Sequence, residues 1–112
     1  MKKNLLKDVV RNYRAYKDDS TMLYARVERT LATAETEVFL VPVGSRGKPP
    51  DGTNYLIGTR AIEEVMAALE QNGLHCNERG KVKAVIHYAD RDCFIEAPDL
   101  TEADFVPIQE EG

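Results

Sequence analysis

The chain has 112 residues, of which 43% are apolar and 30% charged, the composition of one soluble globular domain. Its 19 acidic residues outnumber its 15 Lys and Arg, and the net charge of -4 disfavours a general nucleic-acid binder. No apolar run reaches the roughly 18 residues of a membrane span, and charged residues interrupt the stretch that a signal peptide would occupy.

Two helices are predicted at the N-terminus. Asn4 can cap the first helix, which runs to about Lys17 with an apolar stripe along one side. Basic residues lie on the opposite side: Lys3, Lys7, Arg11 and Arg14. Ser20 can cap a second helix over residues 21–33. Its inner stripe comprises Leu23, Val27 and Leu31.

Two short strands are predicted in the middle of the chain. Residues 37–43 are nearly all apolar, which favours a buried strand that lies at a sheet edge or ends at Pro42. Residues 54–57 can form the second strand. The segment between them, residues 44–53, is rich in glycine and proline and is expected to form a loop.

A third helix is predicted over residues 60–72. Thr59 can cap its start, and Gly73 stands where a left-handed residue often ends a helix. The spacing of its apolar residues predicts a buried stripe of Ile62, Val65, Met66 and Leu69.

The last third of the chain alternates apolar and polar residues. This pattern favours a β-meander of three strands, residues 74–77, 81–88 and 93–97. An acidic tail of about residues 99–112 follows, and Asp99 to Glu102 have the form of a capping box. We therefore expect one α+β domain over residues 1–112, with two N-terminal helices and a third helix packed on a mainly antiparallel sheet of four or five strands.

Part of this order of elements has a counterpart in a known family. Two helices, Val41-Pro42-Val43, a loop with Asp51-Gly52 and a helix capped by Thr59 follow one another over about residues 5–70. This order resembles the N-terminal half of SseB-type (enhanced serine sensitivity) domains. The expected meander departs from that family, and the resemblance implies no roles for individual residues.

Four residues with metal-binding or nucleophilic side chains fall in the expected meander: His75, Cys76, His87 and Cys93. The register that the turns impose points both cysteines to the core and both histidines to the opposite face. The thiols would lie roughly 20 Å apart, too far for a shared zinc ion or a disulfide. His87 would also be unable to activate Cys93. We expect free thiols in a reducing cytoplasm, with no metal, no cofactor and no catalytic residue.

The outer face of the meander is expected to be amphipathic, and its residues are Lys83, Val85, His87, Phe94 and Glu96. Either this face is an exposed partner site, or the apolar residues of the tail or the first helix cover it. Our first hypothesis is a non-catalytic cytoplasmic accessory module of bacteria or phages, of inhibitor, immunity or adaptor type. It would bind another protein, or a second copy of itself, through this face.

Two alternative functions use other residues. A small-ligand-binding protein or enzyme would use the loop at residues 44–53, with Arg46, Lys48, Asp51 and Tyr55 lining the site. That loop lacks the spacing of a nucleotide-binding P-loop. Nucleic-acid binding would use the basic side of the first helix, at Lys7, Arg11 and Arg14, with a steep salt dependence.

Overall fold

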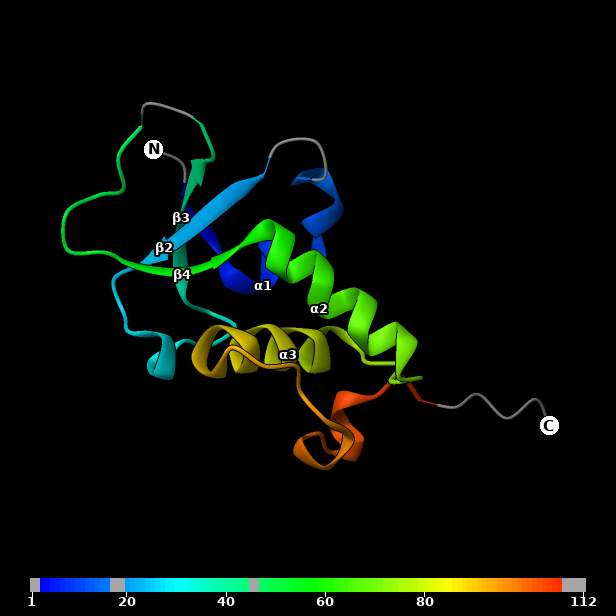
Figure 1. The fold of residues 1–112 in the computed structure, drawn as a ribbon. Helices are drawn as coiled ribbons and strands as arrows, with labels where there is room; N and C mark the ends of the chain where they lie inside the picture. Colours follow the sequence, from blue (N-terminus) through cyan, green and yellow to red (C-terminus); the bar gives the residue numbers. More distant parts are fainter. Residues whose placement is uncertain (1–2, 17–19, 45–46, 108–112) are drawn as a thin grey trace.

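The computed structural model describes residues 3–16, 20–44 and 47–107. Four antiparallel strands form one sheet in the order β1-β3-β2-β4 (Figure 1). The strands are β1 (Lys3–Leu5), β2 (Thr21–Ala25), β3 (Glu37–Pro42) and β4 (Asn54–Gly58). The α-helices are α1 (Leu6–Arg11), α2 (Thr59–Gln71) and α3 (Glu78–Arg91). The α+β class and the antiparallel sheet agree with the prediction.

The main core lies between one face of the sheet and the three α-helices. Alternate residues of the strands point into it, such as Leu23 of β2 and Val38 of β3, and both are fully buried. The buried sides of the helices complete it, with Val9, Ile62 and Val85 at its centre. Figure 1 shows α2 and α3 lying side by side below the sheet.

The opposite face of the sheet carries a smaller buried set. Phe39 and Val41 of β3 are both buried there, outside the main core. The Arg26 guanidinium lies 5.2 Å from the centre of the Phe39 ring and donates a hydrogen bond to the carbonyl oxygen of Asp51. The loop before β4 is therefore tied to this face.

The helix expected over residues 21–33 is wrong. Residues 21–25 form β2, in which alternate side chains are buried and which pairs with β3 and β4. Only a short 3-10 turn, Arg29–Leu31, follows. The apparent helical stripe fails at Leu31, which is 65% exposed. A strand between two partner strands pairs its backbone N–H and C=O groups on both sides. A partly exposed helix would therefore gain no further backbone hydrogen bonds.

The first predicted helix is shorter than expected. Asn4 belongs to β1 instead of capping the helix, and α1 begins at Leu6. The side-chain amide nitrogen of Asn4 is buried and has no hydrogen-bond partner among the described residues. A 3-10 helix, Tyr13–Tyr16, follows α1. The pairing of β1 with β3 draws the start of the chain into the sheet.

The middle of the chain agrees closely with its prediction. β3 lies inside the sheet and ends at Pro42, and β4 leads directly into α2. The four residues of the expected stripe in α2 are buried, and Gly73 has a φ of +68° just beyond the helix. The expected cap at Thr59 is wrong: Gly58 is the N-cap residue and Thr59 is the first helical residue. The Oγ1 of Thr59 accepts a hydrogen bond from the backbone N–H of Thr21 instead.

The expected C-terminal β-meander is wrong. Its longest predicted strand is part of α3, whose residues Val82, Val85 and Ala89 form a buried helical stripe. The side chain of Asn77 caps this helix by accepting a hydrogen bond from the backbone N–H of Gly80, 2.9 Å away. The first expected strand contributes one isolated bridge, and the third is irregular. The cap and the stripe together favour a helix over alternation.

Candidate functional site

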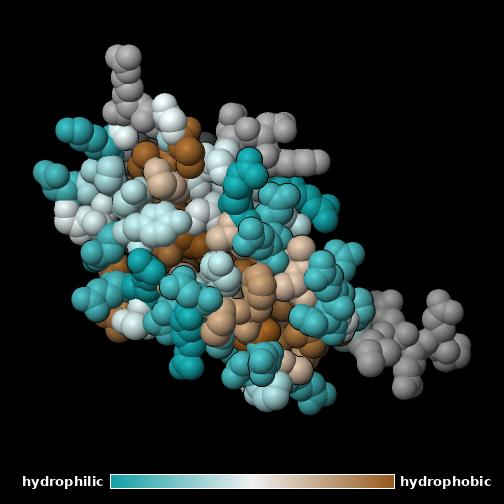
Figure 2. Space-filling model, in the orientation of Figure 1, coloured by the Kyte–Doolittle hydropathy of each residue, from teal (hydrophilic) through white to brown (hydrophobic). Residues whose placement is uncertain are grey.

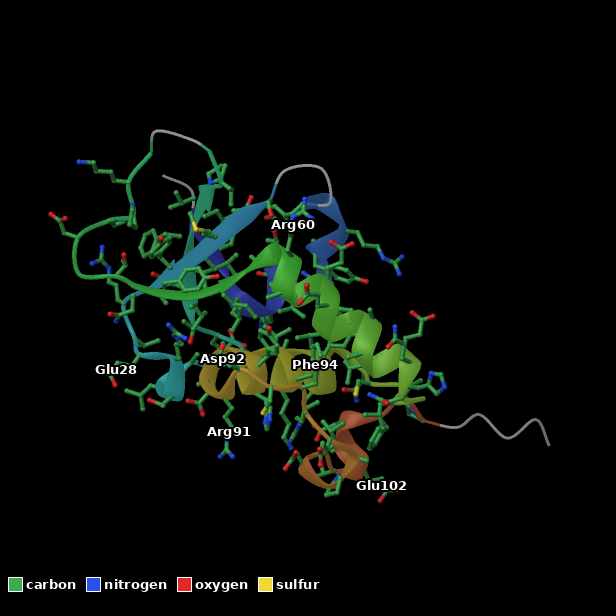
Figure 3. All side chains as sticks on the ribbon, in the orientation of Figure 1. Glu28, Arg60, Arg91, Asp92, Phe94 and Glu102 are labelled. Atoms are coloured by element: carbon green, nitrogen blue, oxygen red, sulfur yellow. The ribbon has the colours of Figure 1, made fainter. Side chains whose placement is uncertain are left out.

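The chain reverses immediately after α3. Asp92 has a φ of 55° and ψ of 28°, the left-handed conformation that often ends a helix. The following residues run back along the helix, and Phe94 lies over α3 while Arg91 points away from it (Figure 3). The rings of Tyr88 and Phe94 pack 5.4 Å apart between centroids.

The reversal brings a thiol and an imidazole together. Cys93 Sγ lies 3.6 Å from His87 Nε2, within hydrogen-bonding reach for sulfur. The expectation that these two residues lie on opposite faces is wrong, and so is the expectation that Cys93 points into the core, because its side chain is exposed. The residues are paired because the intervening chain is a helix end followed by a turn, whereas strand register would have separated them.

The second thiol has the buried environment that was expected. Cys76 lies in the core, and burial raises the pKa of its thiol. His75 beside it is exposed on the surface. In the part of the chain that the structure describes, no three His, Cys, Asp or Glu side chains group in a way that could hold a metal ion.

A groove of about 510 Å³ runs beside the exposed thiol. It is lined by Asn72, Leu74, Cys93, Phe94, Ile95, Glu96 and Ala97. Phe94 is 44% exposed. Figure 2 shows hydrophobic residues gathered over α2, α3 and the segment after α3, with hydrophilic residues around them.

A fully buried carboxylate joins the C-terminal segment to α3. Asp104 accepts hydrogen bonds from the backbone N–H of Thr101 at 2.8 Å, from Lys83 Nζ at 3.0 Å and from Arg79 Nε at 3.2 Å. The Thr101 N–H is the main cause that lowers the pKa of Asp104 to about 2, and Lys83 adds to it, while burial acts in the opposite direction. Asp104 is not among the residues predicted from the sequence, although Thr101-x-x-Asp104 has the spacing of a capping box.

A second groove, of about 420 Å³, lies between α1 and α3. It is lined by Lys7, Ala34, Glu78, Arg79, Val82, Lys83 and Ile86. Its apolar residues are Ala34 and, one turn apart on α3, Val82 and Ile86, of which Val82 is only 5% exposed. Three cations and one carboxylate stand around them.

The residues expected on the outer face of the meander are divided between several environments. Val85 is fully buried in the core, so it cannot contact a partner. Lys83 binds the buried carboxylate of Asp104, and His87 lies one turn further along α3 beside the exposed thiol. Phe94 packs on a tyrosine of α3, and the backbone N–H of Glu96 donates to a side chain of the next turn. The expected flat face does not form because α3 replaces the strand.

The residues expected to form a ligand site in the glycine- and proline-rich loop are only partly described. Arg46 lies outside the described residues, and Lys48 and Asp51 are exposed. Tyr55 lies on β4, where burial raises the pKa of its hydroxyl. No hydrogen bond, ion pair or ring contact among the described residues joins Lys48, Asp51 and Tyr55 to one another.

The basic residues of the first helix are all engaged with neighbours. Lys7 Nζ lies 2.8 Å from Glu35 Oε1, and this hydrogen bond raises the pKa of Lys7. Arg11 Nε lies 3.6 Å from Glu78 Oε1 at the start of α3. The Arg14 guanidinium lies over the ring of the tyrosine before it. The three cations therefore do not form an unpaired basic stripe.

Comparisons with known proteins gave no match among family models, curated proteins or solved structures. The resemblance to SseB-type domains has no support from them. Within the described part of the chain, no helix is long and apolar enough to cross a membrane.

Proposed function

We propose that the protein is a non-catalytic docking module that binds an acidic, amphipathic segment of another protein in the groove between α1 and α3. The observation that carries the proposal is the composition of this groove. Ile86, with the 5% of Val82 that stays exposed, forms an apolar strip bordered by Lys7, Arg79 and Lys83. A segment with carboxylates on one side and apolar side chains on the other would satisfy both features.

The charge of the groove differs from that of the whole chain. The chain carries a net charge of -4, whereas three cations and one carboxylate line the groove. Lys7 is paired with Glu35, so the excess positive charge of the groove rests on Arg79 and Lys83. Arg79 and Lys83 share a single buried carboxylate, Asp104, so this cluster retains a net positive charge. Complementary charge of this kind directs the approach of an acidic partner and disfavours a basic one.

The groove is also held in a defined shape. Arg11 connects α1 to Glu78 at the start of α3, and Asp104 fixes Arg79 and Lys83 from the other side. A partner segment would therefore meet a preformed surface and would not have to order it, which favours affinity.

The test is selection from a random peptide display library with the full chain as target. We expect the selected peptides to combine Asp or Glu with large apolar residues and to shift the backbone amide resonances of Val82 and Ile86. The variant Ile86→Asp should abolish binding, because it places a carboxylate in the apolar strip. Lys7→Glu, an exposed change on the rim, should weaken binding and increase its dissociation constant.

The matched control is Arg60→Glu, an exposed charge reversal on α2 at a residue that does not line the groove. It should bind the selected peptides as the parent protein does. Selection of peptides without acidic residues, or binding that survives both groove variants, would contradict the proposal. Saturable binding of duplex nucleic acid that is lost in Lys7→Glu would favour the nucleic-acid alternative instead.

A further inference from the structure

We propose that Cys93 forms mixed disulfides with low-molecular-weight peptide disulfides of the glutathione type, with His87 as the base that accepts the thiol proton. This modification site is separate from the proposed docking groove, because no residue lines both grooves.

Cys93 and His87 have the geometry of a nucleophile and its base. Cys93 Sγ and His87 Nε2 are 3.6 Å apart, and the thiol is exposed to solvent. A thiol is a weak nucleophile until its proton leaves, and a neighbouring imidazole is the most common group that accepts it. The left-handed Asp92 holds the two side chains together by turning the chain back along α3.

The two thiols of the chain also differ in their surroundings. Cys76 is buried, and its pKa is raised by burial. Neither feature favours reaction with a solute, because a buried neutral thiol is both inaccessible and non-nucleophilic. The chain thus contains one accessible thiol beside an imidazole, Cys93, and one unreactive buried thiol, Cys76, which serves as an internal control.

Cys93 also lines a groove. Its volume of about 510 Å³ lies in the range of small-ligand sites. Leu74 and Phe94 contribute apolar surface, while Asn72 and Glu96 contribute polar groups. The aliphatic segments and amides of a tripeptide-sized adduct match this lining, and its amino group can pair with Glu96. Its carboxylates face solvent, because no cation among the described residues lines the groove.

The reaction is a thiol–disulfide exchange. The thiol proton of Cys93 moves to His87 Nε2, and the thiolate attacks one sulfur of the small disulfide. A new S–S bond forms to Cys93 as the S–S bond of the reagent breaks. The departing thiolate takes a proton from the imidazolium, so the products are the mixed disulfide and one free small thiol. The small disulfide is the oxidant.

The test is incubation of the reduced protein with oxidised glutathione near neutral pH, with the adduct followed by intact mass and located by peptide mapping. We expect one adduct, on Cys93, and none in Cys93→Ser. His87→Gln should slow the reaction about ten-fold near neutral pH, because it removes the base that accepts the thiol proton. In alkaline solution the parent and variant rates should converge, since hydroxide then removes the proton.

The control is His75→Gln, which removes the other imidazole and should leave the rate unchanged. His87→Asn serves as a second variant if His87→Gln fails to fold as judged by circular dichroism. Equal rates for His87→Gln, or for His87→Asn, and the parent protein near neutral pH would overturn the proposal, and so would an adduct on Cys76 that forms as fast as that on Cys93. Neither result bears on the peptide-display test of the docking groove.

Discussion

At Gly80, α3 and the C-terminal segment approach each other closely. An added Cβ there would overlap the carbonyl oxygen of Asp104 and lie 2.8 Å from the Cβ of Cys76. Glycine is therefore required at this position by the close approach of backbone and not by an unusual backbone angle. The same approach lets the backbone N–H of Asn77 donate to the Asp104 carbonyl at 3.0 Å.

We expect Gly80→Ala to lower the free energy of unfolding by about 1–3 kcal/mol, because the new methyl group must displace backbone. Urea denaturation measures this change. Lys81→Ala, the next residue on the same helix and exposed, is the control and should change stability by less than about 0.5 kcal/mol. Equal stability of Gly80→Ala and the parent protein would show that the two segments separate easily.

We expect the stability of the folded protein to fall in acid because of Asp104. Its pKa is about 2 in the folded protein against an ordinary value of 3.8, so the folded state favours the charged carboxylate. The resulting stabilisation is fully present above pH 3.8 and is lost as the pH falls towards 2. Asp104→Asn should be less stable than the parent above this range, by about 2 kcal/mol for the lost charged hydrogen bonds.

The measurement is urea denaturation of both proteins across acidic pH. The stability difference between parent and Asp104→Asn should shrink as the pH falls from 3.8 to about 2. Glu102→Gln, which changes an exposed acid two residues away, is the matched control. A difference that stays constant with pH would mean that Asp104 does not titrate with a lowered pKa.

At the scale of the element, α3 explains most of the differences between expectation and structure. Val82, Ala84, Ile86 and Tyr88 alternate as a strand would, but Val82, Val85 and Ala89 also have helical spacing. The deciding signal precedes the segment: Asn77 is followed by an acid at the first helical position. A short apolar run fits both the strand period and the helical period, so the residues that flank it decide which structure forms.

Asn77 should contribute through two separate contacts. Its Oδ1 caps α3, and its Nδ2 contacts the C-terminal segment by donating to the carbonyl oxygens of Ala103 at 2.8 Å and of Phe105 at 3.3 Å. Asn77→Ala removes both and should cost about 1–2 kcal/mol of unfolding free energy, whereas Asn77→Asp keeps the cap and should cost less. Hydrogen exchange of the C-terminal segment should increase in both variants. Equal losses of stability in Asn77→Ala and Asn77→Asp would assign the effect to the hydrogen bonds that Nδ2 donates to Ala103 and Phe105.

At the scale of the whole molecule, the order of the strands decides which of them is most protected. β3 pairs with β1 and β2, and β2 pairs with β3 and β4, so both are interior strands. β1 and β4 each pair on one side only, within the described residues. The interior strands also supply fully buried residues on the helix side, including Leu23 and Val38.

We expect amide hydrogen exchange to be slowest in β2 and β3 and faster in the outer strands, because interior amides open only with most of the fold. Mass-spectrometric exchange on peptides covering each strand measures the order. Residues 47–53, which precede β4 outside any helix or strand, provide the fast reference. Slower exchange in β4 than in β2 would contradict the strand order.

The amino-acid sequence alone determined the features that depend on local signals: the strand ending at Pro42, the following strand, and α2 with its buried stripe and terminal Gly73. Pro42 lacks a backbone N–H and Gly73 readily adopts a positive φ, so these two residues mark where a strand and a helix end. The tertiary structure decided the identity of residues 21–25, because their pattern fits two periods and their pairing with β3 and β4 chooses between them. Residues 81–88 also fit two periods, and for them the Asn77 cap before the segment is the local signal that favours a helix. It also decided the meeting of Cys93 with His87, because a helix end and a chain reversal bring together side chains that strand register would keep apart.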